Sequence, residues 1–208
     1  MSDRPPTRRD GDPLFAIVVL AAGASTRLGR TKQLVELDGR PLVRHVIDAA
    51  AAVDPAQLVV VLGHDADAVA AAIGDAPCEI VHNPLAAEGQ GTSLAAGIGA
   101  LGPDISRAVI LLGDEPHVDP AVIACVAFGA GLIRRARYRD RAGHPISFDR
   151  PMWGRLQSVS GDQGARSVLR EFPDEIREVQ VDADAPIDLD TEDDLRALSR
   201  RHQTPPPV

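Results

Sequence analysis

An apolar run that ends in a loop of small and basic residues constrains this chain more than any other feature of its sequence. The run Phe15–Leu20 is aliphatic, β-branched and aromatic, which is typical of a strand buried on both faces. The loop that follows contains Gly23 and carries the basic side chains Arg27 and Lys32. Small residues let a ligand approach the backbone, and successive free N–H groups can cradle an oxyanion. The sequence therefore predicts a polyphosphate-binding loop at the carboxyl end of a central strand.

Two common phosphate-binding loops do not match this segment. A Walker A loop has the pattern G-x-x-x-x-G-K, whereas five residues separate Gly23 from Gly29 and Lys32 comes three positions later. A dinucleotide-binding loop has the pattern G-x-G-x-x-G, and the second of its glycines is missing after Gly23. A glycine-rich loop that only permits a tight turn between strand and helix stays open as the alternative.

Composition and patterning favour one α/β domain over residues 14–200. A chain of 208 residues can bury one sizeable core, and with 3% aromatic residues that core must be largely aliphatic. Strand-like and helix-like runs alternate, which predicts a three-layer α/β/α sandwich with a mostly parallel, Rossmann-like sheet. Short strands late in the chain predict a small antiparallel addition that closes over the site. Residues 1–13 and 201–208 are predicted to be flexible tails.

Charge and cysteine content limit the partners. A net charge of −8 argues against binding to nucleic acid, which depends on neutralising phosphates. No apolar run is long enough for a membrane helix, and residues 1–13 lack the apolar core of a signal peptide. Cys78 and Cys125 form no metal-binding pattern, which favours a reduced, cytoplasmic location. A nucleotide substrate needs only a local cationic loop and a divalent metal.

The loop carries a family resemblance. The pattern Leu20-Ala21-Ala22-Gly23-x-Ser25-x-Arg27-Leu28-Gly29-x-x-Lys32, followed by Gln33-Leu34, resembles the molybdenum cofactor cytidylyltransferase group of the MobA-like NTP transferase family. These enzymes have a nucleotide-diphospho-sugar transferase-type fold, and the resemblance extends from about Phe15 to Leu198. It implies that the following residues bind the nucleotide: Leu20, Ala21, Ala22, Gly23, Ser25, Arg27 and Lys32.

A second apolar run, 109–112, ends in the sequence Gly113-Asp114-Glu115-Pro116-His117. A carboxylate at this position lies at the same sheet edge as the loop, and Mg²⁺ prefers one or two carboxylates together with phosphate oxygens. Asp114 is therefore the first candidate ligand for Mg²⁺, or for Mn²⁺ in its place; the alternative is a turn residue before proline. The resembling group usually has Asp-Gln-Pro-Leu here, so Glu115 and His117 put the identity of the acceptor in question.

An acid-rich segment, 182–194, supplies further carboxylates. Read as a strand, it places Asp188 and Asp190 on one face. The family pattern Asp-x-Asp-Thr implies that one of these two residues contacts the metal. The acids from 192 to 194 are explained equally well by the dipole at the start of a last helix.

Two further segments match the family. Asn83, Gly91 and Ser93 are implied in nucleotide binding, where amide and hydroxyl groups can read a pyrimidine edge; the alternative is that Thr92 or Ser93 only caps a helix. The motifs Gly143-His144-Pro145-Ile146 and Gly161-Asp162-Gln163-Gly164-Ala165-Arg166 are typical of the cytidylyltransferase group. They imply that the acceptor is bound by His144, Asp162 and Arg166.

The resemblance implies transfer of CMP from CTP to the terminal phosphate of molybdopterin, a phosphorylated pterin-type acceptor, with release of pyrophosphate. Arg27, Lys32 and Asp114 would act by positioning and charge neutralisation. A molybdenum-dependent enzyme would receive the product. Two alternatives remain open: nucleotidyl transfer to another small phosphorylated acceptor, and an NAD(P)H-dependent oxidoreductase on the same fold, resembling enzymes that reduce a pyridine-derived pigment.

A basic run, 134–141, stands out in this acidic chain. If it is extended, Arg135, Arg137, Arg139 and Arg141 project from one face. It is then either a solvated edge strand protected from aggregation, or a site for the acceptor phosphate or for an acidic partner surface.

Overall fold

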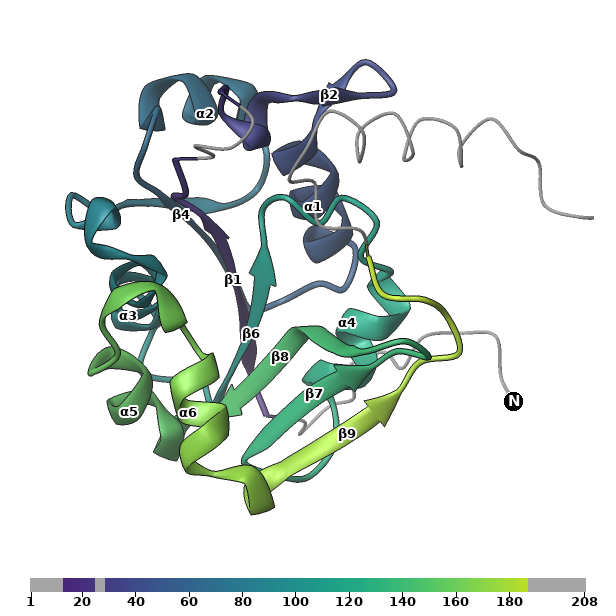
Figure 1. Cartoon of the computed structure of the whole chain (residues 1–208). Helices are drawn as coiled ribbons and strands as arrows, with labels where there is room; N and C mark the ends of the chain where they lie inside the picture. The colour runs from purple at the N-terminus through teal and green to yellow at the C-terminus, as the bar shows by residue number, and fades with distance from the viewer. Residues whose placement is uncertain (1–12, 25–28, 187–208) are drawn as a thin grey trace, which may run out of the picture.

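Seven strands form the main sheet of the computed structural model, which describes residues 13–24 and 29–186. In spatial order they are β5 (Glu79–His82), β4 (Gln57–Leu62), β1 (Phe15–Ala21), β6 (Arg107–Leu112), β8 (Ala142–Asp149), β7 (Ile133–Arg137) and β9 (Ile176–Gln180). β8 runs antiparallel to both of its neighbours, and the other neighbouring pairs are parallel (Figure 1). The prediction of a mostly parallel sheet in a single α/β domain is confirmed.

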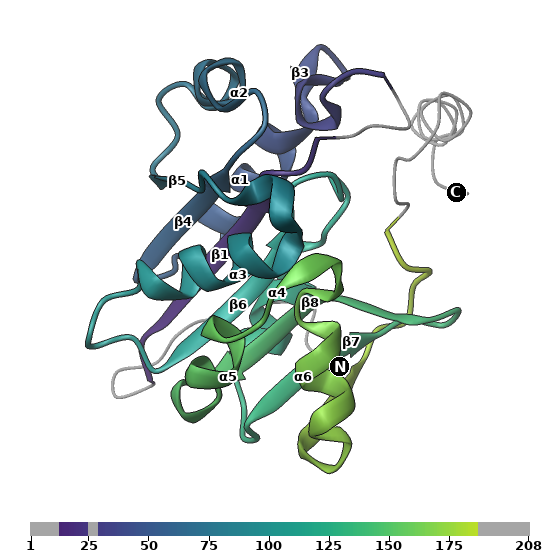
Figure 2. The same cartoon turned by 60° about the vertical axis from the view of Figure 1, so that its left-hand side comes forward.

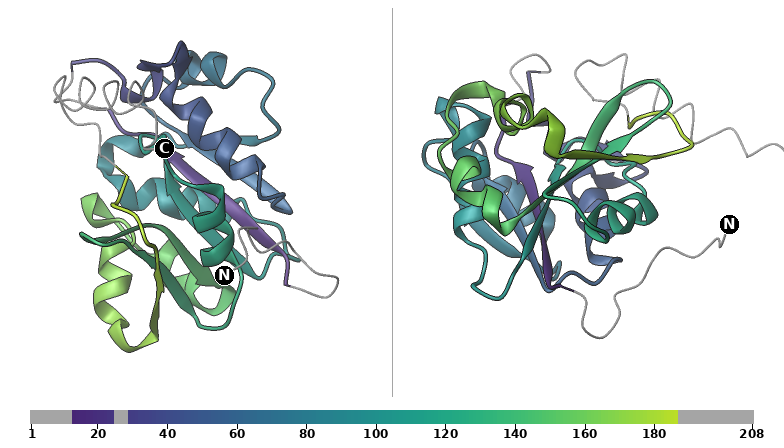
Figure 3. Two further views of the ribbon diagram at one scale, coloured as in Figure 1. Left: turned by 90° about the vertical axis from the view of Figure 1, so that its right-hand side faces the viewer. Right: turned by 90° about the horizontal axis from the view of Figure 1, so that it is seen from below.

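Helices cover both faces of this sheet, as the view from below in Figure 3 shows. One layer contains α1 (Leu42–Ala51), α2 (Ala66–Ile73) and α4 (Pro120–Ala127). The other contains α3 (Gln90–Gly99), α5 (Trp153–Gln157) and α6 (Arg166–Glu171), which come forward in Figure 2. The three-layer sandwich follows from strands that are apolar on both faces and therefore need a helix layer on each side.

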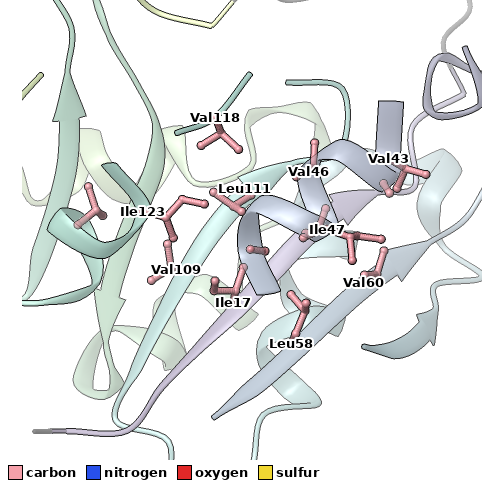
Figure 4. Close-up of a cluster of buried hydrophobic side chains, with 14 of the residues drawn as sticks. Ile17, Val43, Val46, Ile47, Leu58, Val60, Val109, Leu111, Val118 and Ile123 are labelled. Carbon is pink, nitrogen blue, oxygen red and sulfur yellow. The ribbon is translucent and has the colours of Figure 1, made fainter. Parts of the chain in front are cut away.

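Each helix layer encloses its own apolar cluster. In the first cluster Ile17, Val109 and Leu111 of the sheet meet Ile47 of α1 and Ile123 of α4 (Figure 4). In the second, strand residues of the opposite parity pack against α3, α5 and α6. Because successive strand side chains point to opposite faces, β1 contributes to both clusters and is buried along its whole length.

The predicted small antiparallel addition is present in two places: β8 is inserted antiparallel into the main sheet, and β2 (Glu36–Leu37) and β3 (Arg40–Pro41) form a two-stranded sheet apart from it. Two features differ from the sequence predictions. Helix α5 was not predicted, because its five residues are too few to show a helical period. Helix α3 begins at Gln90, before the two residues that were considered as its cap, Thr92 and Ser93. The predicted tails lie outside the described residues, apart from Pro13.

The basic run is not a solvated edge strand. β9 pairs with β7 and is itself the edge of the sheet. A register shift between Arg135 and Ala136 also breaks the predicted single face of arginines. Acids supplied by β9 and the residues after it neutralise the run, since Arg135 donates to Glu178 over 2.8 Å and Arg139 donates to Asp182 over 2.9 Å.

The strand order places a crevice at the centre of the sheet. From β1 the chain proceeds outward through β4 and β5, and then returns to the other side of β1 as β6. In open α/β sheets, ligands bind beyond the carboxyl ends of the strands where the order reverses in this way. In the part of the chain that the structure describes, every helix is too short or too polar to cross a lipid bilayer.

Candidate active site

A cavity of about 330 Å³ opens at the carboxyl ends of β1 and β6. Its walls come from the loop after β1, from the start of α3 and from the tip of β6. The predicted residues that line it are Leu20, Ala22, Gly23, Ser93, Asp114 and Asp162. Ala21 does not line it, because its side chain is 1% exposed and points into the first apolar cluster. The structure thus brings six of the described candidate residues together at the predicted sheet edge.

Lys32 and Asp114 meet beside this cavity although 82 positions separate them. The short helix η1 (Lys32–Leu34) holds Lys32 with only 8% of its surface exposed, and its Nζ lies 3.5 Å from Oδ2 of Asp114. The Asp114 side chain is more open, at 27% exposure. The buried ammonium of Lys32 and the partly exposed carboxylate of Asp114 suit an anionic ligand that brings a metal cation with it. The ammonium can then pair with the anion, and the carboxylate can pair with the cation.

The carboxylates near the cavity fit a metal that phosphate oxygens help to bind. Among the described residues there is no group of three His, Cys, Asp or Glu side chains able to hold a metal. Mg²⁺ does not need such a cage, because it is usually bound by one or two carboxylates with substrate phosphates and water. Asp114 and Asp162 both face the cavity and could supply those carboxylates.

Asn83 takes part in the site indirectly. It is 6% exposed, and its amide nitrogen lies 2.9 Å from both Oγ1 of Thr92 and Oγ of Ser93, to which it donates. Its amide oxygen accepts from the backbone N–H of Leu85 over 3.0 Å. Asn83 therefore fixes Ser93 at the cavity wall instead of facing a ligand. Neither Thr92 nor Ser93 caps α3, since the N-cap residue is Gly89.

Gly89 and Gly91 allow a close backbone approach, but the segment that approaches belongs to the protein itself. A Cβ at Gly89, whose φ is +115°, would lie 2.3 Å from the carbonyl carbon of Gly161. A Cβ at Gly91 would lie 3.0 Å from the backbone of Ser160. These glycines seat the 160–162 segment against the start of α3, and this contact places Asp162 at the cavity.

A second cavity, of about 400 Å³, adjoins the first and shares Gln90 and Leu112 with it. It lies between the sheet and α6. His144 and Arg166 line it, as expected for residues grouped as acceptor-binding, whereas Asp162 lines the first cavity. Glu115, which is 6% exposed, lines it as well. Its carboxylate Oε1 lies 4.0 Å from Nδ1 of His144.

Burial holds His144 in its neutral form. Desolvation lowers the pKa of its imidazole to about 4, and the nearby positive charge of Arg166 acts in the same direction. Tyr138 fixes the backbone here, because its hydroxyl donates to the carbonyl of His144 over 2.8 Å. Burial in turn raises the pKa of Tyr138, so this hydroxyl stays protonated and remains a donor.

Some functional candidates were missed and others cannot be placed. Gln33 and Gln90 line the first cavity but were not assigned as site residues, whereas Arg135 and Arg141, which line the second, were considered for the acceptor phosphate only as one alternative for the basic run. The signal for Gln33 was present in the motif Lys32-Gln33-Leu34, whereas the others depend on tertiary contacts. The remaining predicted residues lie outside the described residues: Ser25, Arg27, Asp188 and Asp190.

Residues 17–179 match the family model of the MobA-like NTP transferase domain. Among solved structures, Rv0371c from Mycobacterium tuberculosis H37Rv superposes with a TM-score of 0.83 and 33% sequence identity, covering 90% of this chain and 98% of that one. A nucleotidyl transferase from Methanothermobacter, at 21% identity and a TM-score of 0.78 over 90% of this chain and 97% of that one, shares the fold.

Two sequence relatives match different shares of this chain. The bifunctional protein GlmU of Halorhodospira halophila is 41% identical over 132 residues, which are 62% of this chain. The match spans only 28% of GlmU's own length. Nicotine blue oxidoreductase of Paenarthrobacter nicotinovorans is 34% identical over 172 residues, covering 77% of this chain and 84% of that protein.

Proposed function

The chain belongs to the MobA-like NTP transferase family, and on that basis we propose that it transfers CMP from CTP to the terminal phosphate of molybdopterin. The observation that carries this proposal is the meeting of Lys32 and Asp114 beside a cavity at the sheet's switch point. A second cavity next to it leaves room for an acceptor. The product would pass to a molybdenum-dependent enzyme, within the cytoplasm.

In this proposal the first cavity holds the nucleotide. The backbone of Ala22 and Gly23, with the Nζ of Lys32, faces the phosphates, and Arg27, which lies outside the described residues, would add a second cation. Ala22 carries a methyl group where guanylyl enzymes are expected to have glycine, which narrows the space for a purine and favours CTP. Ser93, held by Asn83, offers a hydroxyl group at the cavity wall.

A divalent cation, Mg²⁺ or Mn²⁺, fits this arrangement. Asp114 would hold it, with Asp162 within the same cavity and Asp188 or Asp190 as the further candidates from the sequence. When bound, the cation would neutralise charge on the phosphates. One structural relative, Rv0371c from M. tuberculosis, was solved in complex with manganese; it is 32% identical and covers 90% of this chain.

The acceptor phosphate attacks the α-phosphorus of CTP in line, a new P–O bond forms, and the bond to pyrophosphate breaks. The nucleophile is already an anion, so the reaction requires no general base. Lys32 offsets the charge that develops on the leaving pyrophosphate. His144 is neutral at pH 7 and therefore serves as a hydrogen-bonding group rather than as a cation in the acceptor cavity.

Release of pyrophosphate from each of the four nucleoside triphosphates, with molybdopterin as acceptor and Mg²⁺ present, tests this function. We expect turnover with CTP, and a loss of about 100-fold or more in Asp114→Asn, which keeps the shape but removes the charge. The melting temperature should change little, because Asp114 is half-open. Turnover with another phosphorylated compound but not with molybdopterin would transfer the proposal to that acceptor.

An oxidoreductase is the second candidate, because the similarity to nicotine blue oxidoreductase covers most of both chains. The loop after β1 lacks the second glycine of a dinucleotide-binding motif, which weighs against it. Oxidation of NADH or NADPH in the presence of a quinonoid pyridine pigment, with no pyrophosphate released from any nucleotide, would favour this candidate over nucleotidyl transfer.

A further inference from the structure

Three arginines from separate elements line the second cavity. Arg135 comes from β7, Arg141 from the turn between β7 and β8, and Arg166 from the start of α6. Among the described residues that line this cavity Glu115 is the only acidic side chain, and His144 is neutral at pH 7. Arg135 is paired with Glu178 and Arg141 lies 3.7 Å from Asp140, so Arg166 is the arginine of this wall that no described carboxylate pairs.

Two of these arginines have unused hydrogen-bonding capacity. Within the described part of the chain, the exposed side chain of Arg166 makes no hydrogen bond or ion pair. Arg135 donates through one terminal nitrogen to Glu178, but its Nε is buried and has no partner. A buried donor without a partner costs about 1–3 kcal/mol, and guanidinium groups bind carboxylates and phosphates through paired N–H groups. An anion in this cavity would satisfy both side chains.

The position of these arginines separates that anion from the reacting phosphate. In-line attack places the acceptor phosphate on the side of the α-phosphorus away from pyrophosphate and Lys32, next to the cation that Asp114 would hold at the tip of β6. Arg135 lies on β7, opposite Ile146 of β8, which in turn faces Ile110 of β6. Two strand spacings, about 10 Å, therefore lie between β6 and β7. A single phosphate group cannot occupy both places.

Resting on the proposed function, we infer that the acceptor carries a second anionic group, remote from its reacting phosphate, which Arg135 and Arg166 bind in the second cavity. The acceptor then crosses the sheet from β6 toward β7, with Leu112 and Gln90 beneath its middle. Arg141, which donates to the carbonyl of Pro186 over 2.7 Å, adds positive charge at the same wall. An acceptor with one phosphate and an otherwise neutral body would leave the Nε of Arg135 and the guanidinium of Arg166 without an anionic partner.

Calorimetric binding of two synthetic probes tests this inference. Hexyl phosphate carries one anionic group, and 6-(phosphonooxy)hexanoate carries the same phosphate with a carboxylate at the far end of an equal chain. We expect the wild-type protein to bind the second probe at least about tenfold more tightly. Arg166→Gln and Arg135→Gln should each reduce this preference to less than about threefold.

Arg155→Gln is the matched control, because Arg155 is an exposed arginine of α5 that pairs with Glu171 and does not line the cavity. It should retain the full preference. Arg135→Gln loses the ion pair with Glu178 and could therefore be unstable. Arg166→Gln breaks no hydrogen bond or ion pair among the described residues, so this variant can decide the test by itself. Equal binding of the two probes to the wild type, or an unchanged preference in Arg166→Gln, would overturn the inference.

CTP binding by the same preparation separates this inference from the proposed function. Binding of CTP without a preference between the probes overturns only the second anionic group. A preference between the probes without CTP binding upholds the anion-binding cavity and removes the nucleotidyl transfer.

Discussion

His144 connects the acceptor cavity to the stability of the fold. Its side chain is 20% exposed, and burial together with Arg166 lowers the pKa of the imidazole to about 4. Glu115 is 4.0 Å away, beyond hydrogen-bonding distance. In the unfolded chain the same imidazole takes up a proton near pH 6.5. Between these two values the unfolded state binds more protons, so the free energy of unfolding decreases as the pH falls.

We therefore expect His144 to cost the fold roughly 3 kcal/mol between pH 6.5 and pH 4, and nothing above about pH 7.5. His144→Gln removes the titrating group while keeping a polar side chain, so its free energy of unfolding should fall less on acidification. Urea unfolding of both proteins at pH 7.5 and pH 4.5 measures the difference. Equal losses of stability in the two proteins would show that His144 titrates normally.

At the scale of single residues, the sequence predicted which residues belong to the site better than it predicted which side chains contact one another. Lys32 and Asp114 were predicted at one site because loops and strand tips share a sheet edge, but their 3.5 Å approach needs the fold. Asn83 was expected to read the base, and it instead holds Ser93 through its amide. Nothing local in the sequence distinguishes those two roles, because either one uses a buried amide at a strand end.

At the scale of elements, the start of α3 and the 160–162 segment depend on each other. Gly89 is the residue where they meet, with a φ of +115° and no room for a Cβ against Gly161. Gly89→Ala should therefore cost about 1–3 kcal/mol of stability, and it should weaken CTP binding because Asp162 must move. Gly154→Ala is the matched control, since a Cβ there, within α5, meets nothing within 4 Å.

Urea unfolding and CTP titration of both variants check this expectation. Gly154→Ala should be as stable as the wild type or more so, because alanine favours the helix. A Gly89→Ala protein that unfolds at the same urea concentration as the wild type would mean that the two segments move apart at little cost.

Strands and helices with a clear hydrophobic pattern were predictable from the sequence, whereas the direction and the partners of the strands were not. The apolar runs Phe15–Leu20 and 109–112 are typical of buried strands, and they form most of β1 and β6. The place of β8 was not predictable, because a short strand has the same pattern in either direction. The paired state of the basic run likewise depends on Glu178 of β9, 43 positions from Arg135.

At the scale of the whole molecule, two adjoining cavities lie on the same side of one switch point. The nucleotide cavity is built on the parallel half of the sheet, from β1 and β6. The acceptor cavity is built where β8 and β7 extend the sheet and α6 covers it. In the proposed function, the order of strands would therefore separate the part that binds the nucleotide from the part that selects the acceptor. The sequence could predict the first from its loop, whereas the second is assembled from residues far apart in the chain.

The most direct test of the central claim is calorimetric titration of the protein with CTP, GTP and NADPH in the presence of Mg²⁺. We expect CTP to bind at least about tenfold more tightly than either GTP or NADPH. Lys32→Ala should weaken CTP binding by about tenfold or more, and the loss should be larger at low ionic strength because salt screens charge interactions. Tight binding of NADPH without binding of CTP, or CTP affinity unchanged in Lys32→Ala, would contradict the assignment of the first cavity to a nucleoside triphosphate.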